Sequence, residues 1–198
     1  MYGYMLCVAG LISIAGCERS AGTVPVRVID LIEEFERAEQ RPPRGHRIPA
    51  HTAGSVTRPA IVMPVPSRVT WRLPLPQNGI LRTFVAVDDA APGVPRGAVR
   101  FRMGIADDRI YEGLTALTVT PEQRGWIGFE ADLSAYAGRK WSLFYRPDRI
   151  IWNVVLAADP GGAGGAMAVW GASEIVTDTR AAREYAARRR ELRSSRLR

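Results

Sequence analysis

Cysteine and histidine are scarce in this chain of 198 residues, and their scarcity limits its chemistry. The two cysteines, Cys7 and Cys17, both lie near the N-terminus, so no disulfide can link distant parts of the body of the chain. No G-x-S-x-G motif is present, and neither histidine stands in a pattern typical of a catalytic triad. A glycoside hydrolase would instead need two carboxylates flanking a cleft. We therefore expect a protein that is not an enzyme.

Long apolar runs are also missing, because Met5–Ile14 is too short to span a bilayer as a helix. It has the length of the hydrophobic region of a signal peptide. The run leads into Ile14-Ala15-Gly16-Cys17, which resembles the bacterial lipobox. This resemblance implies a signal peptide over residues 1–16 and attachment of lipid, including palmitate, to Cys17. Because Glu18 and not Asp follows the cysteine, it also favours the outer membrane of the cell envelope over the inner membrane.

Two alternatives stay open at this end of the chain. The first five residues, MYGYM, contain no Lys or Arg, whereas signal peptides normally begin with positive charge. The sequence therefore does not fix the true start codon. The alternative to a lipid anchor is a buried apolar strand with an incidental cysteine.

Positive charge is concentrated at the C-terminus. The net charge is +7, and Thr179–Arg198 supplies most of it, with eight Arg and two Glu. Thr177 or Asp178 can cap a helix, so we expect a basic helix or tail over residues 178–198. Its positive charge suits contact with anionic lipid or lipopolysaccharide, and the alternative is a tail that only aids solubility. No nucleic acid partner is expected, because the lipobox resemblance implies export.

Short alternating segments fill the middle of the chain. In Ile127–Asp132 and in Val99–Ile105, apolar and polar residues alternate with the period of a half-buried strand. Arg100 and Arg102 lie on what we expect to be a solvated face. Turn residues separate these segments, which indicates a β-sandwich and not βαβ units. The expected strands are 55–62, 67–73, 81–87, 98–106, 110–118, 126–132, 141–146, 151–157 and 166–176, the last one broken at Gly171.

The segment Trp126–Tyr145 resembles part of a known family. Its form, D-L-S-A-Y-A-G followed by W-S-L, resembles a segment of jelly-roll β-sandwich modules of the galactose-binding-like and carbohydrate-binding type. The resemblance implies an all-β fold, a jelly roll of about 8–9 antiparallel strands over residues 55–177. It also implies a non-catalytic module that binds glycan. The alternative function is a scaffold that holds another protein of the cell envelope.

Residues 17–54 are expected to form a tether, a short helix and a loop. Asp30 and Glu33 fit a capping box ahead of an apolar-periodic run. The sequence therefore predicts a helix over residues 30–40, which Pro42 and its neighbouring proline end. We expect this helix to pack against an edge or an end of the sandwich.

The expected loop, residues 41–54, holds both histidines of the chain, His46 and His51. Two histidines at this spacing raise the question of a metal site. No cysteine or acidic residue accompanies them, and Arg44 and Arg47 would repel a cation. A metal site is therefore not expected in this loop.

Aromatic side chains beside polar ones are the candidates for sugar binding. Sugar rings stack on exposed aromatic rings, and their hydroxyls need polar partners. Trp152 and Asn153 place a ring next to an amide just after a turn, and Arg109 with Tyr111 is a second such combination. We expect these four residues to contribute to a ligand site. For most tryptophans, burial in the core is the competing expectation.

Two pairs of carboxylates, Asp88-Asp89 and Asp107-Asp108, each follow an expected strand. Hard oxygen ligands of this kind suit Ca²⁺, so the sequence raises the hypothesis of a structural calcium site. Asp is also an ordinary turn residue, which is the alternative explanation. No other cofactor is expected.

Overall fold

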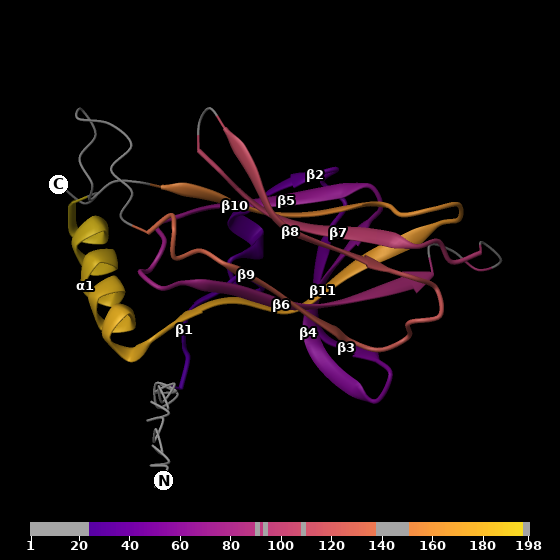
Figure 1. The fold of residues 1–198 in the computed structure, drawn as a ribbon, viewed down its shortest axis with the longest axis horizontal. Helices are drawn as coiled ribbons and strands as arrows, with labels where there is room; N and C mark the ends of the chain where they lie inside the picture. The colour runs from indigo at the N-terminus through magenta and orange to yellow at the C-terminus, as the bar shows by residue number, and fades with distance from the viewer. Residues whose placement is uncertain (1–23, 90–91, 93–94, 108–109, 138–150, 196–198) are drawn as a thin grey trace, which may run out of the picture.

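The computed structural model describes residues 24–89, 92, 95–107, 110–137 and 151–195, and it shows two β-sheets packed face to face (Figure 1). The helix α1 (Thr179–Ser195) stands at one end of this sandwich. The strands are β1 (Val26–Asp30), β2 (Glu39–Arg41), β3 (His46–Ala53), β4 (Val56–Pro64), β5 (Ser67–Leu73), β6 (Ile80–Asp89), β7 (Val99–Ala106), β8 (Tyr111–Val119), β9 (Ile127–Asp132), β10 (Trp152–Pro160) and β11 (Ala166–Thr177).

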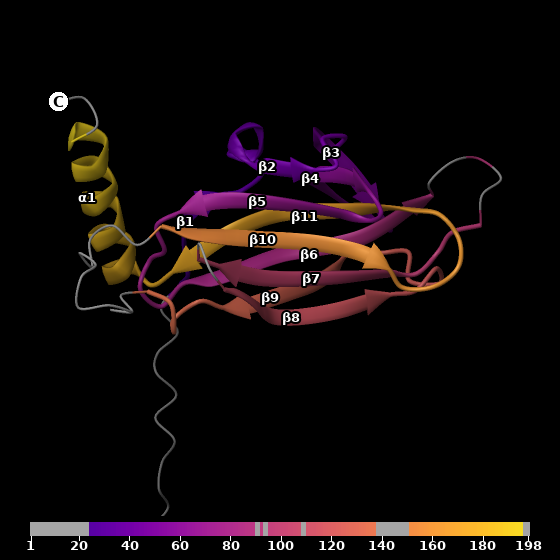
Figure 2. The same ribbon diagram turned by 90° about the horizontal axis from the view of Figure 1, so that it is seen from above.

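The chain passes repeatedly from one sheet to the other. Sheet A has the strand order β3-β4-β11-β6-β9, and β1 also pairs with β11. Sheet B has the order β2-β5-β10-β7-β8, and Figure 2 shows β5, β10, β7 and β8 side by side. These neighbours are all antiparallel, and β4, β5, β6 and β7 alternate between the two layers. The fold is a jelly-roll β-sandwich, as the resemblance implied.

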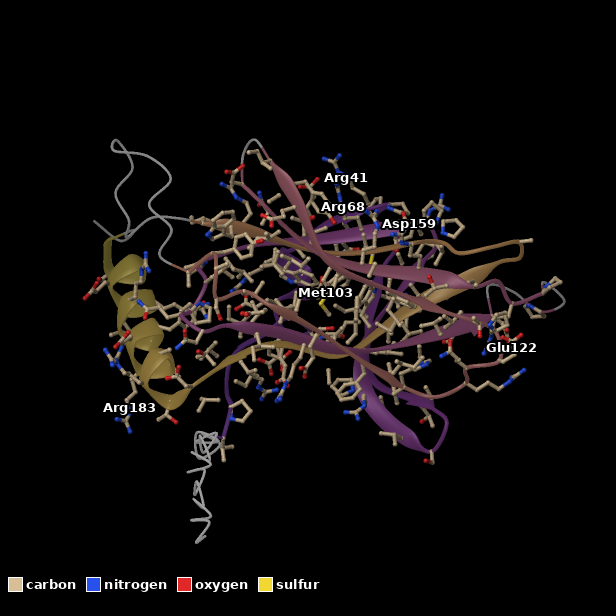
Figure 3. The ribbon with its side chains drawn as sticks, viewed as in Figure 1. Arg41, Arg68, Met103, Glu122, Asp159 and Arg183 are labelled. Carbon is tan, nitrogen blue, oxygen red and sulfur yellow. The ribbon has the colours of Figure 1, made fainter. Side chains whose placement is uncertain are left out.

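The core lies between the sheets and takes side chains from both. Phe101 of β7 and Trp170 of β11 meet edge to face, with ring centroids 4.8 Å apart and an interplanar angle of 85°. Met103 is fully buried and lies between the layers in Figure 3. Such an aromatic pair contributes about 0.5–1.5 kcal/mol beyond its burial, so this contact stabilises the packing of sheet A on sheet B.

Every expected strand that falls within the described residues is present, with its ends shifted by a few residues at most. β9 shows the expected alternation: Phe129 and Ala131 are buried, whereas Glu130 and Asp132 are exposed. The expected strand 141–146 lies outside the described residues.

The expected helix over residues 30–40 is wrong. These residues form the end of β1, a turn, the short 3-10 helix Phe35–Arg37 and the start of β2. The carboxylate of Asp30 does accept hydrogen bonds from the N–H groups of Ile32 and Glu33, at 3.0 and 3.2 Å, as a capping residue would. A helix of this length is marginal on its own, and the flanking residues pair instead with β11 and β5.

The expected loop over residues 41–54 is also wrong, because most of it forms strand β3, which pairs with β4. The pairing shifts register between Ile48 and His51, and such a bulge bends a strand. The tip of the β3–β4 hairpin, at Gly54, lies next to Gly125 in the β8–β9 connection. Gly54 has a φ of 62°, a conformation that favours glycine.

The expected break of the last strand at Gly171 is a bulge within a continuous β11. The register with β6 shifts between Gly171 and Glu174, and Ala172 has a φ of 46°. The buried hydroxyls of Thr83 and Ser173 share a hydrogen bond of 2.6 Å beside this bulge. Because each buried hydroxyl has a partner, neither carries an uncompensated desolvation cost.

The helix α1 begins where the sequence predicts. The carboxylate of Asp178 accepts a hydrogen bond from the N–H of Ala181 at 2.9 Å, and one from the side-chain amide of Asn78 at 2.9 Å. These two hydrogen bonds lower the pKa of Asp178. Ala181 and Tyr185 are buried, and Tyr185 lines a groove between α1 and β1. Within the described residues, no helix is both long and apolar enough to cross a membrane.

We expect Tyr185→Phe to stabilise the protein. Within the described part of the chain, the buried hydroxyl of Tyr185 has no hydrogen-bond partner. The substitution removes this desolvated group and keeps the ring, so the free energy of unfolding at pH 7 should rise by about 1 kcal/mol. Urea unfolding of both proteins would measure this, and a lower value for the variant would contradict it.

The same substitution should change the stability at alkaline pH. Burial raises the pKa of Tyr185 from 10.0 to about 12. A pKa raised in the folded state gives a stabilisation that is complete below pH 10 and is lost as the pH rises through about 12. The unfolding free energy of the wild type should therefore fall over this range, and the part of the fall due to Tyr185 should be missing in Tyr185→Phe.

Candidate functional site

The outer face of sheet A is covered by its own side chains. The ring of Trp126 lies directly over Gly171, where a Cβ atom would come within 2.5 Å of it. The indole N–H of Trp126 donates a hydrogen bond to the carbonyl of Val56 at 2.8 Å, which holds the ring against the β3–β4 hairpin. His51 packs edge-on against this ring, with centroids 5.5 Å apart.

A second apolar cluster lies on this outer face. The guanidinium of Arg58 lies 3.5 Å from the ring centroid of Phe84, and Nε2 of His51 lies 3.4 Å from the carboxylate of Asp88. These contacts leave little of the face free for a ligand. The buried members of the cluster are Ala53, Ala60, Val62, Ala86 and Val169.

The outer face of sheet B, which we call the sheet-B face, has polar and charged side chains around small, buried ones. Its centre is β10, where Val155 lies between Thr70 of β5 and Gly104 of β7. The next outward position, Ala157, lies between two arginines, one on each neighbouring strand. The inward positions of β10 belong to the core, so its outward positions are Asn153, Val155, Ala157 and Asp159.

Tyr111 supplies an aromatic surface on the sheet-B face. It pairs with Ala106 of β7, and its ring lies over Gly104. A Cβ at Gly104 would meet Oη, Cε2 and Cζ of Tyr111 at nearly equal distances, each far too short for a real contact. Three nearly equidistant atoms mean that the ring turns one face to the sheet. Because Tyr111 is 45% exposed, we infer that the opposite face of the ring is open to solvent.

The structure brings together two of the four residues expected to bind sugar. Asn153 and Tyr111 are both register partners of Ala106, so they lie in one row of the sheet-B face. The expectation for Trp152 is wrong, because this side chain is 7% exposed and belongs to the core. Successive residues of a strand point to opposite faces, so Trp152 and Asn153 cannot contact the same ligand. Arg109 lies outside the described residues.

Most of the side chains that rim the sheet-B face are charged. Arg102 of β7 pairs with Asp159 of β10 at 2.6 Å, and Arg41 of β2 pairs with Glu39 at 2.6 Å. Figure 3 shows Arg41, Arg68 and Asp159 on this side of the sandwich. Three further arginines of the face form no ion pair or hydrogen bond with the described residues: Arg68, Arg72 and Arg100.

The carboxylates expected to bind calcium do not come together. Asp88 lies beside a histidine on sheet A, and Asp89 pairs with Arg96 just before β7, at 2.9 Å. Asp107 follows β7 and accepts a hydrogen bond within its own turn, and Asp108 lies outside the described residues. The length of β7, about 26 Å, therefore separates Asp89 from Asp107. The described residues contain no group of three potential metal ligands, and calcium binding stays an untested prediction.

A hydrolase needs two carboxylates at a cleft, and two carboxylates of β9 line one cavity of this structure. Glu130 and Asp132 line a cavity of about 430 Å³ beside Ser134. Hydrogen bonds from the Ser134 hydroxyl and backbone N–H lower the pKa of Asp132. A general acid needs its pKa raised, so Asp132 is unsuited to that role.

No family model matches this chain, and no curated protein matches it. Among solved structures, it is similar to TmCBM61 in complex with β-1,4-galactotriose, with 10% identity, coverage of 76% of this chain and 97% of that chain, and a TM-score of 0.47. It is also similar to the CBM22-1 xylan-binding domain of Paenibacillus barcinonensis Xyn10C, with 11% identity, coverage of 80% of this chain and 99% of that chain, and a TM-score of 0.44. A third similar structure contains the CBM51-2 and INT domains of Clostridium perfringens ZmpB, with 13% identity, coverage of 67% of this chain and 26% of that chain, and a TM-score of 0.44. These similarities are too distant to indicate a ligand.

Proposed function

We propose that this protein is an exported, lipid-anchored and non-catalytic lipoprotein of the cell envelope that binds glycan on the sheet-B face. The observation that carries this proposal is the ring of Tyr111, which lies against Gly104 with its other face open. A flat, solvent-exposed aromatic ring is the surface on which the apolar face of a sugar stacks.

Polar groups beside the ring suit the hydroxyls of a sugar. Asn153 lies in the same row as Tyr111, and its amide both donates and accepts hydrogen bonds. Thr70 adds a hydroxyl on the far side of Val155. A ring with amide and hydroxyl groups nearby is the combination that fixes a sugar in one orientation.

The alternative, a surface that holds another envelope protein, has less support. A protein interface usually presents a contiguous apolar patch of several hundred Å². Among the exposed apolar side chains of the described residues, Val26, Val56 and Ile80 lie on three strands of sheet A, and only Ile110, Tyr111 and Ile151 lie near one another, at one end of sheet B.

A glycan array tests this function. The probe is the full chain carrying Cys17→Ser, which should remain unlipidated and therefore soluble. We expect it to bind at least one class of glycan, and Val56→Ala in the same background should bind equally, because Val56 is 43% exposed but lies on β4 of sheet A. Failure to bind any glycan would overturn the proposal.

The anchor is tested separately. Cys17 lies outside the described residues, and the proposal that it carries lipid depends on the lipobox resemblance. Cells expressing the wild-type chain and labelled with radioactive palmitate should yield a labelled protein, because the Cys17 thiolate accepts the diacylglyceryl chain. Cys17→Ser should remove the label, and Cys7→Ser provides the matched control. Label that persists in Cys17→Ser would contradict a lipid anchor at this residue.

The basic helix adds a second contact to the proposal. Arg183 and Arg190 are exposed on α1, and each basic residue near an anionic membrane surface contributes about 1 kcal/mol. The groove between α1 and β1 has a volume of about 610 Å³ and is lined by Arg27, Arg189 and Tyr185. We include contact of α1 with anionic lipid or lipopolysaccharide in the proposed function, with the outer membrane as the favoured location.

A further inference from the structure

The arginines of the sheet-B face outnumber its acidic residues. The outward positions of β2, β5, β7 and β10 hold five arginines but only two carboxylates, Glu39 and Asp159. Each carboxylate already pairs with one arginine, at 2.6 Å. Arg68, Arg72 and Arg100 are exposed and form no ion pair with the described residues. Asp159 lies opposite Arg100 in the register but pairs with Arg102, so the five arginines and two carboxylates leave a net charge of +3.

The pairing of strands places these charges close together. Arg41 and Arg68 lie directly opposite each other on β2 and β5. Like charges in directly opposite positions destabilise a sheet. The pair of Arg41 with Glu39 offsets only part of this repulsion, because Arg68 keeps its full charge. A bound anion between these guanidinium groups would remove the remaining repulsion.

The charges are spread along the face on both sides of Val155 and Ala157, whose small side chains are themselves buried. Arg68 and Arg102 are separated by one strand, about 10 Å, and the residue between them is Ala157. Arg72 lies four residues further along β5, about 13 Å from Arg68, beside Asn153. The distances suit a chain with repeated negative groups better than a single small anion.

The residue type adds to this inference. The chain holds 27 basic residues, and all but Lys140 are arginine. Arginine presents a planar fork of N–H donors that matches a carboxylate or a sulfate with two parallel hydrogen bonds. Tyr111, on the same face, favours a sugar over an acidic peptide or a lipid head group, because its exposed ring offers a stacking surface.

We infer that the sheet-B face binds an anionic polysaccharide, whose carboxylate or sulfate groups are held by Arg68, Arg72 and Arg100 while a sugar ring stacks on Tyr111. This inference rests on the proposed function, since it names the class of glycan that the same face takes. Part of the affinity then comes from charge, so it should weaken as salt is raised from 0.05 to 0.5 M, a range over which screening increases strongly.

The experiment uses immobilised polysaccharides that differ in charge but share a backbone. The Cys17→Ser chain is applied to an array that includes polygalacturonate, its methyl-esterified neutral form, dextran sulfate and dextran. We expect binding to acidic members and at least tenfold weaker binding to their neutral counterparts. The first pair tests carboxylate and the second tests sulfate, so the array distinguishes the two sources of negative charge.

Single substitutions test whether the arginines of the sheet-B face bind the acidic polysaccharide. Arg68→Gln and Arg72→Gln should each reduce affinity for the acidic polysaccharide at least fivefold, whereas Arg47→Gln should stay within twofold of the parent. Arg47 is a matched control because it is an exposed arginine on β3, which belongs to sheet A. Circular dichroism of each variant checks that the fold is intact.

The other possible outcomes distinguish failure of this inference from failure of the proposed glycan-binding function. Binding confined to neutral glycans would overturn the inference and leave the proposed function standing. Equal binding to charged and neutral members, or acidic binding that Arg68→Gln and Arg72→Gln leave unchanged, would do the same. An equal loss in Arg47→Gln would show a general attraction to positive charge and would overturn the inference. No binding to any glycan would remove both.

Discussion

Tyr111→Ala is expected to weaken glycan binding by about 30-fold while leaving the fold unchanged. Truncation of a central aromatic side chain at a binding surface costs about 2 kcal/mol or more, and 1.4 kcal/mol corresponds to a factor of ten in affinity. The residue is 45% exposed, so its removal should change the free energy of unfolding little. Isothermal titration calorimetry with the glycan selected by the array measures the affinity, and urea unfolding measures the stability.

Two further variants test whether the affinity depends on the ring of Tyr111, on its hydroxyl or on the position of the ring over Gly104. Tyr111→Phe keeps the stacking surface and should retain most of the affinity. Gly104→Val should weaken binding almost as much as Tyr111→Ala, because the new side chain would occupy the place where the ring lies. Unchanged affinity in both Tyr111→Ala and Gly104→Val would contradict a role for the ring.

Trp170→Ala is expected to give the largest loss of stability of the changes considered. The side chain is 1% exposed and packs edge to face on Phe101 of the opposite sheet. Replacing a fully buried tryptophan with alanine typically costs about 3–5 kcal/mol, because the remaining core cannot fill the cavity. That is a large share of the stability of a single domain, about 5–15 kcal/mol, so the variant should unfold at a markedly lower urea concentration.

The measurement for Trp170→Ala is the unfolding free energy in urea, with Val56→Ala as a control at an exposed position. The control should change it by less than about 0.5 kcal/mol. A decrease in the free energy of unfolding of less than about 1 kcal/mol in Trp170→Ala would contradict the role of this side chain in packing sheet A on sheet B.

The strands could be predicted from the sequence because burial on one face leaves a two-residue period. In β9, buried Phe129 and Ala131 alternate with exposed Glu130 and Asp132. The same rule explains the error at Trp152. Its neighbour Asn153 faces outward, and a strict alternation places Trp152 in the core.

The N-terminal segment could not be predicted, because local signals and long-range pairing disagree there. Asp30 caps a turn as its sequence context suggests, yet the residues around it pair with distant strands. β3 was missed because its pattern is polar and it contains Pro49, which is typical of a loop or an edge strand.

The sheet-B face could be only partly predicted. Asn153 and Tyr111 were identified because each lies near a complementary residue type in the sequence. Arg68 and Arg102 come from strands that are far apart in the chain, and only the pairing of both with β10 brings them together. The alternation of Arg100, Arg102 and Gly104 marked a solvated strand face, but nothing in the sequence showed that an aromatic ring lies on Gly104.

The most direct test of glycan binding by sheet B is an NMR titration of the soluble Cys17→Ser chain with an oligosaccharide of the glycan selected by the array. We expect the largest shifts at the backbone amides of Thr70, Gly104 and Asn153, which lie on the sheet-B face. Shifts confined to Phe84, Gly171 and their neighbours on sheet A would place the ligand on the opposite face and contradict the proposal.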